Sequence, residues 1–208
     1  MGVMAKDEEF ENEYYYTEEP KSTYRERTIK AHIRDFDLTL KSASGIFASR
    51  DVDTASKLLI ENAELPEKGK ILDLGCGYGM IGVVAAKACP NCSVILTDIN
   101  RRAVMIAAEN LKINKLKNAK ARQGNAYEPI KDEKFDLILL NPPMTAGREI
   151  VMCMIKGAPE HLNKGGSLQI VARKSKGGEV LFEEMKKLFS EVRVLAKSGG
   201  FWVVKGTK

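Results

Sequence analysis

Short apolar runs alternate with segments of helical spacing along most of the chain, from about residue 70 onward. This alternation is typical of βαβ units and predicts a parallel sheet flanked by helices. The expected strands are residues 70–74, 93–97, 119–123, 135–140 and 167–172. The expected helices are residues 79–88, 148–161, 179–189 and a segment capped by Asn100, whose side chain can accept a bond from a free backbone amide.

The end of the chain adds a hairpin signal. Ser198, Gly199 and Gly200 separate two strands expected at residues 192–197 and 201–205. Glycine adopts the positive φ that a tight turn needs, so these strands are expected to pair antiparallel. The predicted fold class is therefore α/β, with a Rossmann-like, mostly parallel sheet of seven strands, helices on both faces and a C-terminal antiparallel hairpin.

The first part of the chain follows a different pattern. A polar, acidic start precedes an alternating segment at residues 36–40, which predicts a half-buried strand, and an apolar stripe at residues 55–60. A segment of this size with few large apolar side chains makes a marginal core by itself. We therefore expect residues 1–54 to form a small β-containing N-terminal extension and residues 55–208 to form the main domain.

The composition of the chain is typical of a globular protein with a basic main domain. Apolar residues make up 44% and charged residues 29% of the 208 residues, which is typical of a globular chain. The net charge is +5, but residues 1–30 hold eight acids against five bases, so the remainder carries +8. A basic body suits a polyanionic partner, although a Lys-rich surface also serves solubility alone. No apolar run resembles a membrane span or a secretory signal, so a cytoplasmic location is expected.

The four cysteines include one close pair, Cys89 and Cys92. A zinc site normally needs a second pair of Cys or His ligands, and His32 and His161 are isolated in the sequence. We therefore expect no metal site, and reduced cysteines that serve as small buried side chains.

A glycine-rich turn follows the expected strand at residues 70–74. Gly75, Gly77 and Gly79 come shortly after Asp73. Glycine permits strained dihedrals there and lets a ligand approach the backbone closely. The pattern therefore predicts a cofactor site at the end of this strand.

A nicotinamide cofactor is one alternative for this turn. The spacing Gly77-x-Gly79-x-x-Gly82, with Asp98 about 20 residues later, matches a weak dinucleotide pattern. That frame extends into the expected helix, and Asp73 beside the turn would repel a pyrophosphate. The same carboxylate would attract the ammonium end of an amino-acid moiety, which S-adenosylmethionine carries without a phosphate. We find no residues suited to hydride transfer, so S-adenosylmethionine is the expected cofactor.

The second candidate site is Asn141-Pro142-Pro143-Met144, directly after the expected strand at residues 135–140. Strand ends at the carboxyl edge of an open α/β sheet face the ligand crevice. The Asn141 carboxamide oxygen and the Pro142 carbonyl can accept bonds from both hydrogens of a planar amine, which favours a pyramidal nitrogen with an available lone pair. The pattern predicts N-methylation through alignment and this polar clamp, without a strong base. An ordinary strand-ending turn is the alternative.

These motifs resemble those of class I S-adenosylmethionine-dependent methyltransferases. The resemblance lies in residues 71–82, in Asp98 and in the Asn-Pro-Pro-Met tetrapeptide. It implies that Asn141 and Pro142 are catalytic. The residues implied to bind the cofactor are Asp73 near the methionyl end, Gly75 and Gly77 along the cofactor, Asp98 at the ribose hydroxyls, Ile99 against adenine, and Asn125 and Ala126 along the adenine edge.

Over residues 14–205 the chain is similar to small-subunit ribosomal RNA guanine-N(2) methyltransferases of the RsmC type, in a single-core form. The residues that carry this similarity are Tyr15-Tyr16-Thr17-x-x-Pro20, Gly45-Ile46-Phe47, residues 98–103, Pro142-Pro143-Met144 with Gly147-Arg148, and Gly199-Gly200. Related enzymes often have an aromatic residue where this chain has Met144, which weakens an adenine or glutamine target. The similarity implies the 2-amino group of a guanine as the target, and ribosomal RNA or the small ribosomal subunit as the partner.

Candidate residues for substrate contact lie around the tetrapeptide and at two strand ends. They are Pro143, Met144, Phe47 and Arg148, with Arg173 and Lys174 as further cations. An extruded RNA base calls for apolar walls beside cationic contacts. Core packing of Phe47 and plain solvation of the cations are the alternatives.

Two other functions remain open from the sequence. One is a methyltransferase for a protein glutamine or a small amine, which needs no cationic surface. The other is a non-catalytic RNA-binding or assembly factor, against which the intact Asn141 and Asp98 argue. Neither the target nucleotide nor the oligomeric state follows from the sequence.

Overall fold

A computed structural model describes residues 17–19, 22–47 and 51–208 of the chain. Tyr15, Tyr16 and Pro20, which carry part of the family resemblance, lie outside the described residues.

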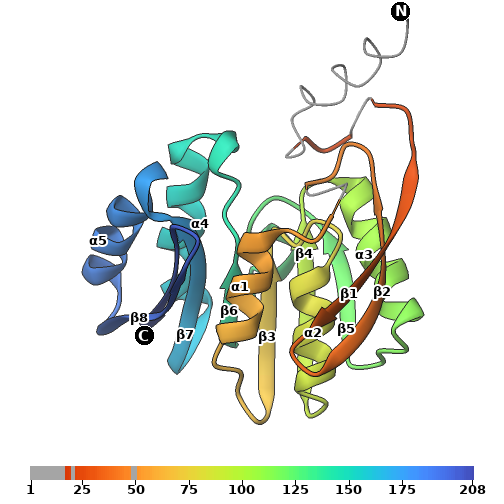
Figure 1. The fold of residues 1–208 in the computed structure, drawn as a ribbon. Helices are drawn as coiled ribbons and strands as arrows, with labels where there is room; N and C mark the ends of the chain where they lie inside the picture. Colours follow the sequence, from red (N-terminus) through yellow and green to blue (C-terminus); the bar gives the residue numbers. More distant parts are fainter. Residues whose placement is uncertain (1–16, 20–21, 48–50) are drawn as a thin grey trace, which may run out of the picture.

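A seven-stranded sheet forms the centre of the molecule (Figure 1), as predicted. Its strands are β3 (Gly69–Leu74), β4 (Cys92–Asp98), β5 (Ala119–Gln123), β6 (Phe135–Leu140), β7 (Leu162–Arg173), β8 (Glu191–Ser198) and β9 (Phe201–Thr207). They lie in the order β5-β4-β3-β6-β7-β9-β8. The first five pair in parallel, whereas β9 pairs antiparallel with both β7 and β8. Gly199 and Gly200 have φ values of 56° and 78°, which confirms the predicted glycine turn of the hairpin.

Helices cover both faces of this sheet. They are α1 (Thr54–Asn62), α2 (Met80–Ala88), α3 (Arg101–Ile113), α4 (Arg148–His161) and α5 (Gly178–Leu188), with short 3₁₀ turns η2 (Glu128–Ile130), η3 (Met144–Ala146) and η4 (Lys174–Lys176). Asn100 caps α3 as predicted, because its side chain accepts bonds from the amides of Arg102 and Ala103. Gly82 lies inside α2, where an added Cβ would come within 2.4 Å of Leu96. This glycine therefore serves close helix–sheet packing.

Alternating side chains give each face of the sheet its own apolar core. Ile71 and Leu137 point to the face covered by α1, α2 and α3. Leu72 and Ile138 point to the opposite face, where they pack against α4 and α5. A strand buried on both faces reads as a continuous apolar run, which is why β6 could be predicted from the sequence.

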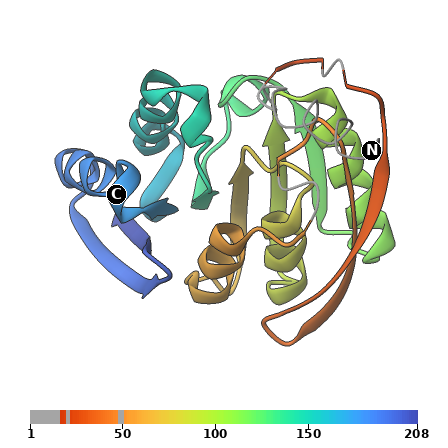
Figure 2. The same ribbon diagram turned by 45° about the horizontal axis from the view of Figure 1, so that its top comes forward.

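An N-terminal hairpin adds a separate two-stranded sheet, β1 (Glu26–Ile33) with β2 (Phe36–Ala43). Figures 1 and 2 place it at the β5 end of the main sheet, far from α5. The Asn110 side chain of α3 holds β2 by accepting from the Lys41 amide at 2.6 Å and donating to the Lys41 carbonyl at 2.8 Å. The alternation predicted β2 but not β1, of which only Ile29 and Ile33 are buried.

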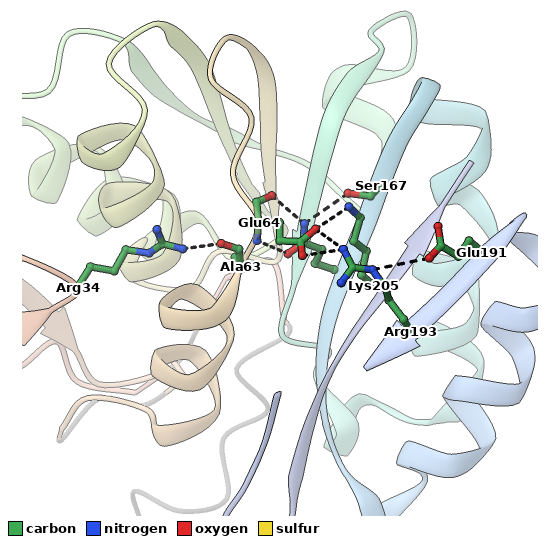
Figure 3. Close-up of polar contacts among 8 residues, drawn as sticks. Arg34, Ala63, Glu64, Ser167, Glu191, Arg193 and Lys205 are labelled. Atoms are coloured by element: carbon green, nitrogen blue, oxygen red, sulfur yellow. Dashed lines mark hydrogen bonds and ion pairs between the residues drawn. The ribbon is translucent and has the colours of Figure 1, made fainter. Parts of the chain in front are cut away.

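The C-terminal end of α1 is fastened to the main sheet by polar contacts (Figure 3). Gln169 of β7, which is fully buried, accepts from the backbone amide of Glu64 and donates to its carbonyl, both at 2.9 Å. The Glu64 carboxylate pairs with Arg193 of β8 at 2.7 Å and with Lys205 of β9 at 2.8 Å. These contacts fix α1 against three strands.

The prediction of reduced cysteines is wrong for one pair. Cys89 ends α2, Cys92 begins β4, and the structure joins them in a disulfide with their Cα atoms 5.3 Å apart. The turn between helix and strand is so short that the chain itself brings the two sulfur atoms together. Both residues are buried, whereas Cys76 and Cys153 are free thiols.

Replacing Gln169 by Met should lower the free energy of unfolding by about 1–3 kcal/mol, because the amide and carbonyl of Glu64 lose their partner while the side-chain volume is kept. Urea denaturation measures the change. Lys187→Ala, which removes an exposed ion pair with Glu184, is the control and should cost no more than about 0.5 kcal/mol. Equal losses in the two variants would contradict the assigned role of Gln169.

Candidate active site

A cavity of about 240 Å³ opens at the carboxyl ends of β3, β4 and β6. Its lining comes from the ends of these strands and the turns after them, from the segments after β2 and β5, from the start of α3 and from one side of α4. The lining residues are Ile46, Phe47, Leu74, Gly75, Gly77, Thr97, Asp98, Ile99, Ala103, Gly124, Asn125, Ala126, Asn141, Pro142, Pro143, Ile150, Cys153 and Met154. The glycine turn and the Asn-Pro-Pro segment, which are far apart in the sequence, therefore share one cavity.

The glycine turn is tied to the neighbouring strand by its backbone. The amides of Gly75 and Cys76 both donate to the Thr97 carbonyl, at 2.8 and 2.9 Å. Gly75 and Gly77 have φ values of 71° and 54°, a left-handed conformation that glycine adopts without steric cost. A Cβ at Gly77 would meet nothing within 4 Å, so it is the positive φ that requires glycine there.

Asp98 at the end of β4 is oriented by backbone donors. Its carboxylate accepts from the Gly77 amide at 2.8 Å and from the Asn100 amide at 2.9 Å. A carboxylate has about four acceptor positions, so the remaining ones can bind ligand hydroxyls. Burial raises the pKa of Asp98, and the backbone bonds oppose that shift. The geometry suits a ribose diol.

Asp73 lies behind the cavity rather than in its lining. It is 1% exposed, and its Oδ2 accepts from the Gly82 amide at 2.8 Å. Its Oδ1 is buried and has no hydrogen-bond partner among the described residues, and the same holds for the hydroxyl of Thr97, which does line the cavity. Burial, with a smaller effect of the Asp98 charge, raises the pKa of Asp73 to about 7. The resemblance implies that Asp73 binds the cofactor, and the structure places this side chain outside the described lining of the cavity.

The segment after β5 forms another wall. Ile99, Asn125 and Ala126 line the cavity, where the resemblance implies the adenine edge. The Asn125 amide donates to the Glu128 carboxylate at 3.1 Å, and the Glu128 amide donates back to the Asn125 carbonyl at 3.0 Å. These reciprocal bonds hold the segment in place.

At the end of β6, Asn141, Pro142 and Pro143 line the same cavity. The Asn141 Nδ2 donates to Asp53 Oδ2 at 2.9 Å and to Ser56 Oγ at 2.8 Å. Both partners belong to the start of α1, which the sequence expectation did not connect with the site. The Asp-x-x-Ser spacing at residues 53–56 is the signal that could have indicated a helix cap, but not its contact with Asn141.

The other substrate candidates lie at different distances from the cavity. Phe47 is in the lining. Met144 is 40% exposed and lies outside the lining, beside the turn at Gly177, where an added Cβ would be 3.3 Å from the Met144 Cε. Arg148 begins α4 and is exposed outside the lining. Of these three, the structure brings only Phe47 together with Asn141.

Three side chains of α4 also line the cavity and were missed from the sequence: Ile150, Cys153 and Met154. They lie on one side of a helix that the sequence predicted at residues 148–161 without assigning any of its side chains to a site. No local signal separates a cavity wall from a core contact in such a helix.

The charge of the cavity selects the kind of ligand it fits. Among the lining residues that the structure describes there is no Lys, Arg or His, whereas Asp98 lies in the wall and Asp73 behind it. A pyrophosphate would meet these carboxylates, and no cation of the described lining would offset their charge. A ligand with a positive charge and hydroxyl groups, such as S-adenosylmethionine, suits both the acids and the orphaned Thr97 hydroxyl.

The part of the chain that the structure describes holds neither a metal cluster nor a membrane-spanning helix. Within it, no group of three or more His, Cys, Asp or Glu side chains could hold a metal ion. No helix in the same ranges is long and apolar enough to cross a membrane.

The fold and the site together define a methyltransferase domain, and comparisons with known proteins agree. Residues 37–205 match the family model described as the methyltransferase small domain. The chain therefore belongs to the methyltransferase small domain family.

One relative matches this chain over its full length, whereas others match it over about half of theirs. It is 37% identical to the Bacillus subtilis protein YbxB over 95% of this chain and 99% of that protein. It is 35% identical to ribosomal RNA small subunit methyltransferase C of Haemophilus influenzae (strain PittGG), over 87% of this chain and 53% of the relative. Thus the chain spans about half the length of the methyltransferase C relatives it matches.

A solved structure shows the same fold. The 16S rRNA N2 methyltransferase RsmC of T. thermophilus, in complex with AdoMet and guanosine, superposes with a TM-score of 0.78 at 26% sequence identity. The match covers 90% of this chain and 51% of that one. It confirms the predicted fold class.

Replacing Asp73 by Asn should change how stability depends on pH. The folded-state pKa of about 7 lies above the ordinary value of 3.8 for an aspartate. The folded state therefore holds the proton more tightly than the unfolded state, and the wild type loses stability as the pH rises from about 4 through 7. The wild type should therefore lose a few kcal/mol relative to Asp73→Asn across this window. Urea denaturation at several pH values measures the difference. A constant difference would refute the assigned burial effect.

Proposed function

We propose that this chain transfers the methyl group of S-adenosylmethionine to the 2-amino group of a guanine in ribosomal RNA. The observation that carries the proposal is the position of Asn141 and Pro142 in the wall of the same cavity as the glycine turn and Asp98. A cofactor bound along Gly75, Gly77 and Asp98 would have its reactive end within reach of an amine held by Asn141.

The chain's own residues supply binding and alignment. S-adenosylmethionine, when bound, supplies a methyl group activated by its sulfonium charge. Asp98 binds the ribose hydroxyls, and the Asn141 carboxamide oxygen and Pro142 carbonyl accept the two hydrogens of the target amine. These bonds turn the nitrogen lone pair toward the methyl carbon, so catalysis comes mainly from orientation. The amine loses a proton after transfer, and no strong base is needed.

The relatives support guanine as the target. The T. thermophilus structure is named as an N2 methyltransferase and contains guanosine, and the H. influenzae relative is named as a small-subunit ribosomal RNA methyltransferase. Phe47 in the cavity wall offers an aromatic face on which a flat base can stack. Met144, which is exposed outside the lining, can add apolar contact but has no aromatic face.

A cationic surface next to the cavity supports RNA as the carrier of this guanine. We define the basic rim as Arg173, Lys174, Lys176 and Lys197, which are all exposed. It spans η4 and the β8–β9 hairpin, which are joined by the bond from the Lys174 amide to the Gly200 carbonyl at 2.9 Å. Since η4 ends at Gly177, beside Met144, the basic rim adjoins the tetrapeptide.

Aromatic rings hold part of the basic rim in place. Arg173 lies 4.6 Å from the centroid of the Phe201 ring. Lys174 and Lys197 lie 5.3 and 5.0 Å from that of Trp202. Lys174 also pairs with Glu179 at 3.3 Å, which offsets one charge. The basic rim suits a phosphate backbone more than it suits a protein glutamine or a small amine.

Asn141→Ala should lower methyl transfer by at least about 100-fold while S-adenosylmethionine binding is kept, because one acceptor of the clamp is lost. Transfer is measured with tritiated S-adenosylmethionine on small-subunit ribosomal RNA, with nucleoside mass spectrometry for 2-methylguanosine. Asn62→Ala, which removes an exposed carboxamide of α1, should leave the rate unchanged. Near wild-type transfer by Asn141→Ala would exclude the clamp. A methylated protein in place of RNA would exclude the proposed substrate.

The Arg173→Ala/Lys197→Ala double variant should bind RNA more weakly and lower the slope of log affinity against log salt by about two, because each lost phosphate contact removes about one unit. Affinity is measured by fluorescence anisotropy at several salt concentrations. Lys30→Ala/Lys68→Ala removes the same charge elsewhere on the surface and is the control. Equal effects of the two double variants would show that only net charge matters, and the basic rim would then not be an RNA site.

A further inference from the structure

The Asn141 side chain is held by two residues at the start of α1. Its Nδ2 donates one hydrogen to Asp53 Oδ2 at 2.9 Å and the other to Ser56 Oγ at 2.8 Å. A carboxamide nitrogen has two hydrogens, so both are used. These contacts join residues 88 and 85 positions apart in the sequence.

The chemistry of these partners decides which end of the carboxamide faces the cavity. An ionised carboxylate only accepts hydrogen bonds, so the nitrogen end of Asn141 must face Asp53. The oxygen end then faces away from α1, toward the cavity that Asn141 lines. A carboxamide rotated by half a turn would instead present N–H groups to a target amine, and donor would meet donor.

We propose that Asp53 and Ser56 are positioning residues that lock the Asn141 carboxamide with its oxygen toward the target amine. This inference rests on the proposed function, in which that oxygen is one acceptor of the clamp. It assigns to α1, which contributes no residue to the cavity lining, a direct part in the geometry of the reaction.

The lock is rigid because Asp53 is also the N-cap of α1. The same Oδ2 accepts from the Ser56 amide at 2.6 Å, and the Asp53 carbonyl accepts from the Lys57 amide at 2.9 Å. Ser56 is 8% exposed, so water competes little for its hydroxyl. The far end of the helix is held by Glu64 and Gln169. Asn141 is thus bonded to a helix that is fixed at both ends.

The negative charge of Asp53 also strengthens the clamp. A carboxylate that accepts from the Asn141 N–H polarises the carboxamide and makes its oxygen a better acceptor, since chains of hydrogen bonds polarise one another. Ser56 orients the same group without adding charge. Asp53 is therefore expected to contribute more than Ser56.

The test combines each positioning variant with Asn141→Ala under single-turnover conditions. Ser56→Ala should lower the rate of methyl transfer about tenfold and Asp53→Ala somewhat more, at unchanged S-adenosylmethionine affinity, because each removes one bond that orients the oxygen. In the Asn141→Ala background the same substitutions should have no further effect on rate, because nothing remains to be positioned. Equal fold-losses in both backgrounds would overturn the proposal.

Two matched variants separate positioning from damage to the helix. Asp53→Asn keeps an oxygen that can accept from both Asn141 and the Ser56 amide but removes the negative charge. It should therefore restore the part of the rate that depends on orientation and not the part that depends on the charge. Lys57→Ala perturbs α1 one residue beyond Ser56, at a side chain that pairs with Glu61 at 3.7 Å, and should leave the rate unchanged. A loss in Lys57→Ala as large as in Ser56→Ala would overturn the proposal.

A readout without substrate distinguishes this inference from the proposed function. In the full chain labelled with ¹⁵N, the side-chain amide hydrogens of Asn141 should exchange slowly with solvent, and Ser56→Ala should accelerate that exchange. Unchanged exchange would overturn the lock whether or not RNA is methylated. If Ser56→Ala accelerates the exchange but the wild-type chain methylates no guanine, the positioning of Asn141 is supported and the proposed function is rejected.

Discussion

Parallel pairing of β3 with β4 on one side and with β6 on the other is the constraint on which the site depends. Leu74 at the end of β3 lies opposite both Thr97 and Leu140, so the three strands end at the same level. The turns that follow them meet at a single edge because parallel strands share their direction. This register brings the glycine turn, Asp98 and Asn141 to one cavity.

Burial of acids at that edge then decides what the cavity can bind. Removing Asp73 and Asp98 from water raises the pKa of both carboxyl groups, and backbone amides of the glycine turn and of the starts of α2 and α3 partly oppose the shift. A positive ligand would stabilise these charges, whereas a phosphate would not. The same folding that brings the strand ends together therefore favours a cationic cofactor there and leaves phosphate contacts to the exposed basic rim.

Helix α1 connects the stability of the fold with the geometry of the reacting group. Its C-terminal end is bonded to the sheet through Gln169 and through the ion pairs of Glu64 (Figure 3). Its N-terminal end presents Asp53 and Ser56 to Asn141. A short helix can hold a side chain in a fixed position only when the helix itself is fixed. Here the hydrogen bonds between the buried Gln169 carboxamide and the Glu64 backbone fix it. The N-terminal hairpin packs in the same apolar core as α1 and completes that side of the molecule.

Local sequence patterns determined the bounds of several strands, a helix cap and the hairpin turn of this protein. The predicted bounds of β5 and β6 agree with the structure residue for residue, although only β6 is an apolar run. Asn100 caps its helix and Gly199 and Gly200 form the hairpin turn, as their backbone chemistry requires. The same patterns located both halves of the candidate site, because glycine conformations and strand ends are properties of short segments. Only the tertiary structure decided that Asp73 lies behind the cavity, that α4 forms one wall, that β1 pairs with β2, and that α1 holds Asn141. The contact between Ser56 and Asn141 joins residues 85 positions apart, and the chain must fold before such residues become neighbours.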